Sequence, residues 1–147
     1  MGNGEVNSFF EKNAESWILN GYNDDGYNHP VGLHRARIIQ KVLESLDGKG
    51  NIVDLGCGGG NVSLMLAELG HSVVGVDESS KMIEISNKLR GEASLEVKER
   101  VTFHCAPLNE NVLDAGKFDV CIAMGVIGYL SHDEILFNAA HHLLKPG

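Results

Sequence analysis

Residues 53–61 read VDLGCGGGN, which places four glycines in nine positions directly after an apolar run. Glycine loses more conformational entropy on folding than any other residue, so this concentration indicates a backbone that must be free of side chains. The run NIVDLG at 51–56 has the Val and Ile content of a buried strand, and the segment after it has helical periodicity. The stretch is therefore interpreted as a strand-to-helix turn whose main chain approaches a ligand.

From residue 51 onward, strand-like and helix-like segments alternate. The strand-like segments are too apolar to have one solvated face, which is typical of a parallel sheet covered on both sides. This alternation predicts an α/β fold with a doubly wound parallel sheet and right-handed crossovers. The expected strands are 51–56, 72–77, 101–106 and 118–125, and the expected helices between and after them are 61–70, 79–91 and 131–147.

Two further helices are expected before the sheet, over 8–22 and 31–46, with the turn-forming sequence GYNDDGYNHP between them. The second of these helices is expected to bury one apolar side. That side consists of Leu33, Ile38, Val42 and Leu46.

Composition narrows the class of protein. The chain has 147 residues and a formal net charge of -8, and its Lys and Arg residues are scattered, which disfavours a surface that tracks nucleic-acid phosphates. The three cysteines have no CxxC spacing, so neither a disulfide framework nor a metal site is expected. No run approaches the length of a membrane span, and a cytoplasmic protein with a small-molecule partner and no membrane contact is the default expectation.

Two cofactor classes compete for such a glycine loop. A dehydrogenase fingerprint has glycines at its first, third and sixth positions, but the sixth position counted from Gly56 is Asn61. Asp54 would lie unfavourably close to a pyrophosphate and favourably close to an ammonium group. The residues thus favour a cofactor with an amino-acid portion over a dinucleotide.

The arrangement DLGCGGG followed by VVGVDES resembles the nucleotide-binding half of class I S-adenosylmethionine-dependent methyltransferases, from about residue 9 to the last residue. The resemblance implies that Asp54 interacts with the cofactor's ammonium side, directly or through water. It also implies that the glycine loop lies along methionine and ribose. Asp77 would accept hydrogen bonds from both ribose hydroxyls, a role that suits a carboxylate because both partners are donors.

The resemblance extends to positions after the third and fourth strands. Ala106 and Pro107 stand where the family commonly has an acidic residue near the adenine, and because proline has no N–H, Leu108 is the expected donor. Met124 and Gly125 are expected beside the methionine portion. The full cofactor-binding set expected is Asp54, Gly56, Cys57, Gly58, Gly60, Asp77, Glu78, Met82, Ala106, Pro107, Leu108, Met124 and Gly125, with Cys57 as a spacer without redox role and Met82 also packing in the core.

The N-terminal wording FEKNAESW is similar to the FDxxAxxY pattern of the small-molecule branch of this family. The resemblance implies a cap segment over 1–30 that covers the cofactor and acceptor, followed by a Rossmann-like cofactor-binding domain over 31–147. No catalytic residue is assigned, although His29, His34 and His132 are candidates for accepting a proton. The candidate acceptor-lining residues are Trp17, Tyr22, Tyr27, His29 and Tyr129.

The implied function is transfer of a methyl group from S-adenosyl-L-methionine to the O, N or C atom of a small molecule. A non-catalytic or incomplete cofactor-binding module is the alternative, and a nicotinamide-dependent oxidoreductase domain is a less favoured one. The family sheet has seven strands, and only four are expected here, so the apolar segment 118–125 is an apparent edge. We therefore expect a sheet truncated after its fourth strand and helix, in a fragment of a longer enzyme or in a chain that completes its sheet as a homodimer or by swapping.

Overall fold

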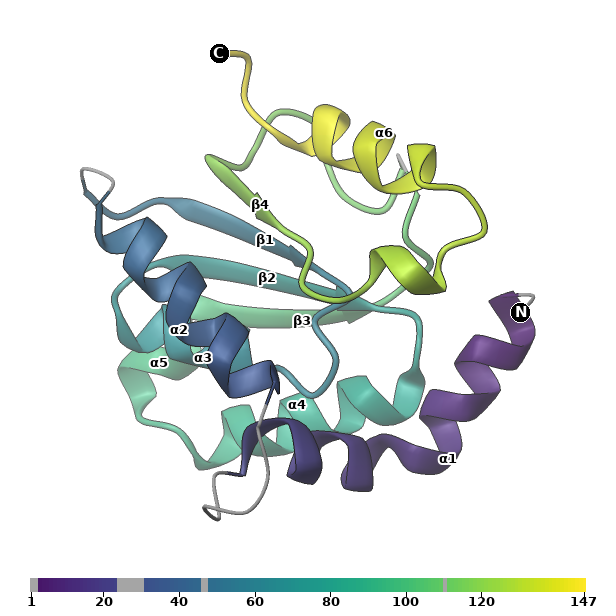
Figure 1. Ribbon diagram of the computed structural model, residues 1–147. Helices are drawn as coiled ribbons and strands as arrows, with labels where there is room; N and C mark the ends of the chain where they lie inside the picture. The colour runs from purple at the N-terminus through teal and green to yellow at the C-terminus, as the bar shows by residue number, and fades with distance from the viewer. Residues whose placement is uncertain (1–2, 24–30, 46–47, 110) are drawn as a thin grey trace.

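A computed structural model describes residues 3–23, 31–45, 48–109 and 111–147. Its centre is a parallel sheet with strand order β3-β2-β1-β4 (Figure 1), which confirms the predicted α/β doubly wound fold. The winding reverses at β1, because β2 and β3 lie on one side of it and β4 on the other. The strands are β1 (Asn51–Leu55), β2 (Ser72–Asp77), β3 (Val101–Cys105) and β4 (Val120–Ile122).

The described segments include all the expected helices, one further short α-helix and one 3-10 helix. The first begins at Asn3, five residues before its expected start, and the last ends at Leu143 rather than at the end of the chain. The additional short helix follows Ser94, whose hydroxyl accepts a hydrogen bond from the N–H of Val97 (3.3 Å). The bounds are α1 (Asn3–Tyr22), α2 (Val31–Glu44), α3 (Asn61–Glu68), α4 (Ser80–Glu92), α5 (Leu95–Arg100), the 3-10 helix η1 (Ile127–Tyr129) and α6 (Glu134–Leu143).

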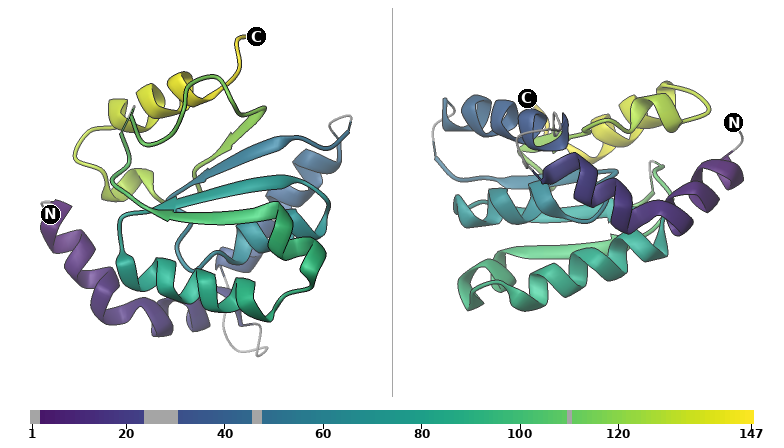
Figure 2. Two further views of the ribbon diagram at one scale, coloured as in Figure 1. Left: turned by 180° about the vertical axis from the view of Figure 1, so that it is seen from behind. Right: turned by 60° about the horizontal axis from the view of Figure 1, so that its bottom comes forward.

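Two apolar cores lie on opposite faces of the sheet. On one face, Ile52 and Val73 pack with Leu66 of α3 and with buried residues of α2 and α5. On the other face, Val53 and Leu55 pack with the buried side of α6. Figure 2 shows α6 on the opposite side of the sheet from α4 in both views. The alternation of side chains along each strand thus feeds two separate cores.

The expectation that every strand is covered on both faces is wrong for β3. Thr102, His104 and Cys105 are exposed, whereas Val101 is fully buried. The physical reason is that no helix follows β3 within the described part of the segment that leads to β4, so one face of this strand has nothing packed against it.

The expected buried side of α2 is also wrong. Ile38 and Val42 are 50% and 56% exposed, while Ala36 and Leu43 are buried and Leu33 is half-buried; Leu46 lies outside the described residues. The helical period is compatible with burial of either side of α2, and the helix buries the side that contains Ala36 and Leu43 rather than the side that contains Ile38.

The fourth strand is shorter than the expected 118–125. Phe118 nevertheless makes an isolated parallel bridge with Leu144, directly after α6. The carboxylate of the next residue, Asp119, accepts a hydrogen bond from the N–H of Asn51 (2.7 Å) and forms an ion pair with Lys145 (2.6 Å). These contacts join the start of β4 to β1 and to the last described residues.

Candidate functional site

The glycine loop joins β1 to α3 at the point where the winding reverses. The N–H groups of Gly56 and Cys57 both donate to the carbonyl of Val76 (2.8 and 3.0 Å), which ties the loop to β2. Gly56, Gly58 and Gly60 have φ angles of 75°, 53° and 80°, in the left-handed region that favours glycine. Glycine is therefore needed here because the backbone turns tightly beyond the carboxyl ends of the strands, where ligands bind in such sheets.

Asp77 ends β2 with both carboxylate oxygens held by main-chain donors. One oxygen accepts from the N–H of Gly58 and the other from the N–H of Ser79, each at 2.9 Å. Burial raises the pKa of Asp77, the two N–H donors oppose that shift, and the charges of Glu78 and Glu11 add to it. Because a carboxylate has about four lone-pair sites, these two bonds leave acceptor capacity for a ligand.

Asp54 is 2% exposed and lies behind the loop rather than on the cavity wall. Its carboxylate accepts a hydrogen bond from the Ser63 hydroxyl of α3 (2.7 Å). Burial raises the pKa of Asp54 to about 6. The hydrogen bond from Ser63 opposes this shift, and the charge of Asp77 adds to it. The structure thus places a desolvated carboxyl group two residues before the glycine loop, bonded to α3 and away from the cavity wall.

A cavity of about 1010 Å³ opens beside this loop. Its walls come from α1, the start of α2, the glycine loop, the end of β2 with the start of α4, and the segment from β4 through η1. It brings together most of the residues predicted from sequence. Those that line it are Trp17, Tyr22, Gly56, Gly58, Asp77, Glu78, Met82, Leu108, Met124, Gly125 and Tyr129.

Five predicted cofactor-binding residues do not line this cavity, and two predicted acceptor residues, Tyr27 and His29, lie outside the described residues. Asp54 lies behind the glycine loop, and the Cys57 thiol is buried, which raises its pKa and agrees with a spacer role. Gly60 faces Phe103 and Ser86. The other two residues outside the cavity wall are Ala106 and Pro107.

Leu108 is the expected main-chain donor to the adenine. Its N–H already donates to the carboxylate of Glu78 (3.4 Å), so this donor is engaged within the protein. A role for Leu108 toward a ligand stays a prediction, and any ligand would compete with Glu78 for the same N–H.

Arg35 of α2 is a cavity-lining residue that sequence reasoning missed. Its guanidinium lies against Gly125, because a Cβ built on that glycine would come within 2.7 Å of Nη1. Burial raises the pKa of Tyr22 to about 12, with the Asp54 charge adding to the shift and the Arg35 charge opposing it. A single arginine on an amphipathic helix has no spacing signal, and only the packing of α2 brings it to this site.

An aromatic wall, Phe9, Phe10, Trp17 and Tyr129, forms one side of the cavity. Phe10 contacts both Trp17 and Tyr129 edge to face, with ring centroids 5.3 and 5.2 Å apart, so the wall joins α1 to η1. Phe9 and Trp17 remain 45% and 44% exposed. This wall offers apolar area and ring edges to a bound molecule.

Within the described residues, no helix is long and apolar enough to span a membrane. The same part of the chain has no group of three or more His, Cys, Asp or Glu side chains that could hold a metal ion.

These features belong to a known class of proteins. A family model described as a methyltransferase domain matches residues 52–147, and the chain therefore belongs to the methyltransferase-domain family. Among curated proteins, the chain is 30% identical over 141 residues to the ubiquinone biosynthesis O-methyltransferase of Actinobacillus pleuropneumoniae serotype 5b (strain L20), covering 93% of this chain and 58% of that protein.

A second relative of the same name comes from Brucella melitensis biotype 2 and is 35% identical over 96 residues. That match covers 65% of this chain and 37% of the relative, so the chain spans roughly a third to three fifths of the length of these curated relatives.

Solved structures show the same fold at low sequence identity. Magnesium protoporphyrin IX methyltransferase from Synechocystis PCC 6803, with bound SAH, matches with a TM-score of 0.76 and 20% identity over 97% of this chain and 68% of that one. The [4+2]-cyclase SpnF matches with a TM-score of 0.81 and 20% identity over 100% of this chain and 58% of that one. Because these two proteins have different names and share one fold, the likeness supports the fold alone, and the reaction is argued from the site.

Proposed function

We propose that this chain binds S-adenosyl-L-methionine in the cavity beside the glycine loop and supports transfer of its methyl group to a small-molecule acceptor. The observation that carries the proposal is the Asp77 carboxylate, held by the N–H groups of Gly58 and Ser79 on the cavity wall. These two hydrogen bonds fix the orientation of the carboxylate, which retains acceptor capacity for the two hydroxyls of a ribose.

The amino-acid portion of the cofactor requires groups of both charges. Arg35, on the cavity wall against Gly125, is suited to the carboxylate. Asp54 supplies negative charge from beneath the loop and would act on the ammonium through an ordered water, since it does not line the cavity. The open side of Gly58, where a Cβ would meet only the Met82 sulfur at 4.0 Å, leaves room for close approach of a ligand to the main chain.

The acceptor would lie against the aromatic wall. Phe9, Trp17 and Tyr129 favour an acceptor with a flat, apolar portion, because aromatic edges and faces give favourable contacts with such groups. The relatives named above are O-methyltransferases, so an oxygen acceptor is the first to test.

The cofactor, when bound, supplies a methyl group already activated by the positive charge of its sulfonium. The protein's own contribution is then to orient the two reactants and to exclude water. Correct orientation of the reactants can by itself lower the barrier to methyl transfer substantially. Neither His34 nor His132 is among the described lining residues, so no catalytic base is assigned.

Calorimetric titration with S-adenosyl-L-methionine, S-adenosylhomocysteine and NAD tests the cofactor assignment. We expect binding of the first two and none of NAD, and binding of NAD alone would overturn it. Incubation with radiolabelled cofactor and cell extract, followed by identification of the labelled compound, tests the transfer. Cofactor binding without any labelled product would support the non-catalytic alternative.

Two further expectations from the sequence stay predictions. They are a cytoplasmic location, and a homodimer or swapped assembly that completes the sheet. The division into a cap over 1–30 and a cofactor-binding domain over 31–147 is likewise a prediction.

A further inference from the structure

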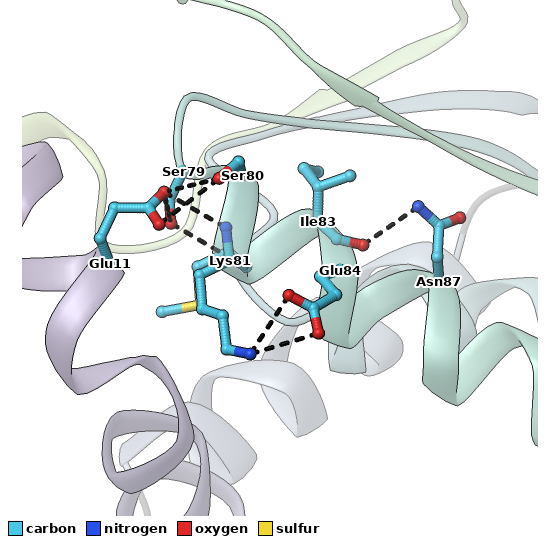
Figure 3. Close-up of polar contacts among 8 residues, drawn as sticks. Glu11, Ser79, Ser80, Lys81, Ile83, Glu84 and Asn87 are labelled. Atoms are coloured by element: carbon cyan, nitrogen blue, oxygen red, sulfur yellow. Dashed lines mark hydrogen bonds and ion pairs between the residues drawn. The ribbon is translucent and has the colours of Figure 1, made fainter.

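Glu11 of α1 makes a cluster of hydrogen bonds to the first turn of α4 (Figure 3). Its carboxylate accepts from the hydroxyls of Ser79 (2.9 Å) and Ser80 (3.2 Å) and from the N–H of Lys81 (3.2 Å). The first N–H groups of a helix have no partner within the helix, and a negative charge there is favourable. These bonds lower the pKa of Glu11, with the Lys81 N–H as the largest cause.

The same serine connects Glu11 to the proposed cofactor site. Ser79 is 2% exposed, its hydroxyl also accepts from the N–H of Met82 (3.2 Å), and its own N–H donates to Asp77 (2.9 Å). Two hydrogen bonds therefore lead from α1 to the carboxylate proposed to bind the ribose. Asp77, Ser79 and Met82 all line the cavity.

The helix that carries Glu11 also forms part of the wall of that cavity. Phe10, Asn13 and Trp17 line it. Ile18 lies so close to Gly59 that a Cβ on this glycine would collide with it, so α1 also rests directly on the glycine loop. Any movement of α1 away from α4 would open the cavity and free the Ser79 hydroxyl at the same time.

We propose that Glu11 is a positioning residue for the cofactor, which holds α1 closed over the cavity and keeps Ser79 and Asp77 in their ligand-binding arrangement. The inference rests on the proposed function of this cavity. Glu11 is exposed and does not line the cavity, so its effect passes through Ser79 and through the position of α1.

Closure is measured first without any ligand. Hydrogen exchange is followed over residues 3–22 in the wild type, in Glu11→Ala and in Glu11→Gln, which keeps the shape but loses the charge. Glu15→Ala is the matched control, because Glu15 is an exposed glutamate on the same helix. We expect faster exchange in Glu11→Ala, an intermediate effect in Glu11→Gln and none in Glu15→Ala. Equal exchange in Glu11→Ala and Glu15→Ala would overturn the proposal.

The second measurement follows dissociation of S-adenosylhomocysteine. Trp17 is the single tryptophan of the chain and lines the cavity, so its fluorescence in stopped-flow displacement reports on α1. Loss of a helix-capping carboxylate predicts roughly three- to tenfold faster dissociation in Glu11→Ala, with Glu15→Ala unchanged. Unchanged dissociation despite faster exchange would also overturn the positioning role. If the wild type binds no S-adenosylhomocysteine in calorimetry, the proposed function itself fails. The hydrogen-exchange measurement needs no ligand, so it still tests separately whether Glu11 holds α1 in place.

Discussion

The two acidic residues beside the glycine loop differ sharply in their surroundings. Asp54 is buried under the loop with the Ser63 hydroxyl as its partner, whereas Asp77 faces the cavity and is held by two N–H groups. Both have raised pKa values, mainly because burial disfavours the charged form. Similar positions near strand ends therefore give one carboxylate that lines the cavity and one that is buried and hydrogen-bonded within the protein.

Replacement of Asp77 tests the ribose contact. Asp77→Ala should weaken binding of S-adenosylmethionine by about 1 to 3 kcal/mol, because the ribose donors would lose their acceptor. Asp114→Ala is the control, since Asp114 is an exposed carboxylate outside the cavity wall. Titration calorimetry measures both, and equal affinity in the two variants would remove this role from Asp77.

Replacement of Asp54 tests the cost of the buried charge. The folded-state pKa of about 6 lies above the ordinary value of 3.8, so Asp54 favours the folded state at low pH and loses that contribution as pH rises through 6. At pH 7 to 8 the ligand-free Asp54→Asn variant should be more stable than the wild type, by on the order of 3 kcal/mol. Urea unfolding at pH 8 and near pH 4 measures this difference, which should shrink at the lower pH.

The same variant should bind S-adenosylmethionine more weakly, because the negative charge proposed to act on the ammonium through water is lost. A variant that is less stable than the wild type at pH 8 would contradict the account of Asp54 as a desolvated charge.

At the scale of elements, the glycine loop is held between three neighbours. Val76 of β2 accepts its N–H groups, Ile18 of α1 lies against Gly59, and Phe103 of β3 lies against Gly60. The loop can thus pass between a strand, a helix and a cavity because Gly56, Gly58, Gly59 and Gly60 have no side chains.

Gly60→Ala tests this packing. Gly60 has a φ angle of 80°, and a Cβ there would come within 2.6 Å of the Phe103 ring and 2.8 Å of Ser86. Strain and overpacking together predict a loss of about 2 kcal/mol or more in the free energy of unfolding.

Gly91→Ala is the control for this substitution. Gly91 lies within α4, where a Cβ would meet nothing within 4 Å, and alanine should stabilise the helix by roughly 0.5 to 1 kcal/mol. Urea denaturation compares the two variants, and equal stability of Gly60→Ala and the wild type would show that the loop can relax.

At the scale of the whole molecule, the sheet has β4 at one edge, paired with β1 on its other side. Beyond this edge, the structure describes a bridge between Phe118 and Leu144 and an ion pair between Lys145 and Asp119. An apolar edge strand offers unpaired main-chain groups to another chain. We expect light scattering after size-exclusion chromatography to give the mass of a dimer or a larger assembly, and a stable monomer would count against this expectation.

Much of this fold could be predicted from the sequence because its signals are local. Short Val- and Ile-rich runs, helical periodicity and the clustered glycines determined the order of elements. The glycine loop and the acidic residues Asp54, near the end of β1, and Asp77, at the end of β2, determined the candidate cofactor class. A strand end, a turn and a helix start are each specified by neighbouring residues, so their positions can be read from one segment at a time.

The tertiary structure alone decided which side chains meet. It brought Arg35 against Gly125, Phe10 against Tyr129 and Glu11 onto the first turn of α4, and it turned Ile38 outward instead of inward. These contacts join residues that are far apart in the sequence, and a helical period can present either of two stripes to the core. The reason is physical: periodicity defines an element and its faces, whereas the choice of face and of partner depends on how all the elements pack together.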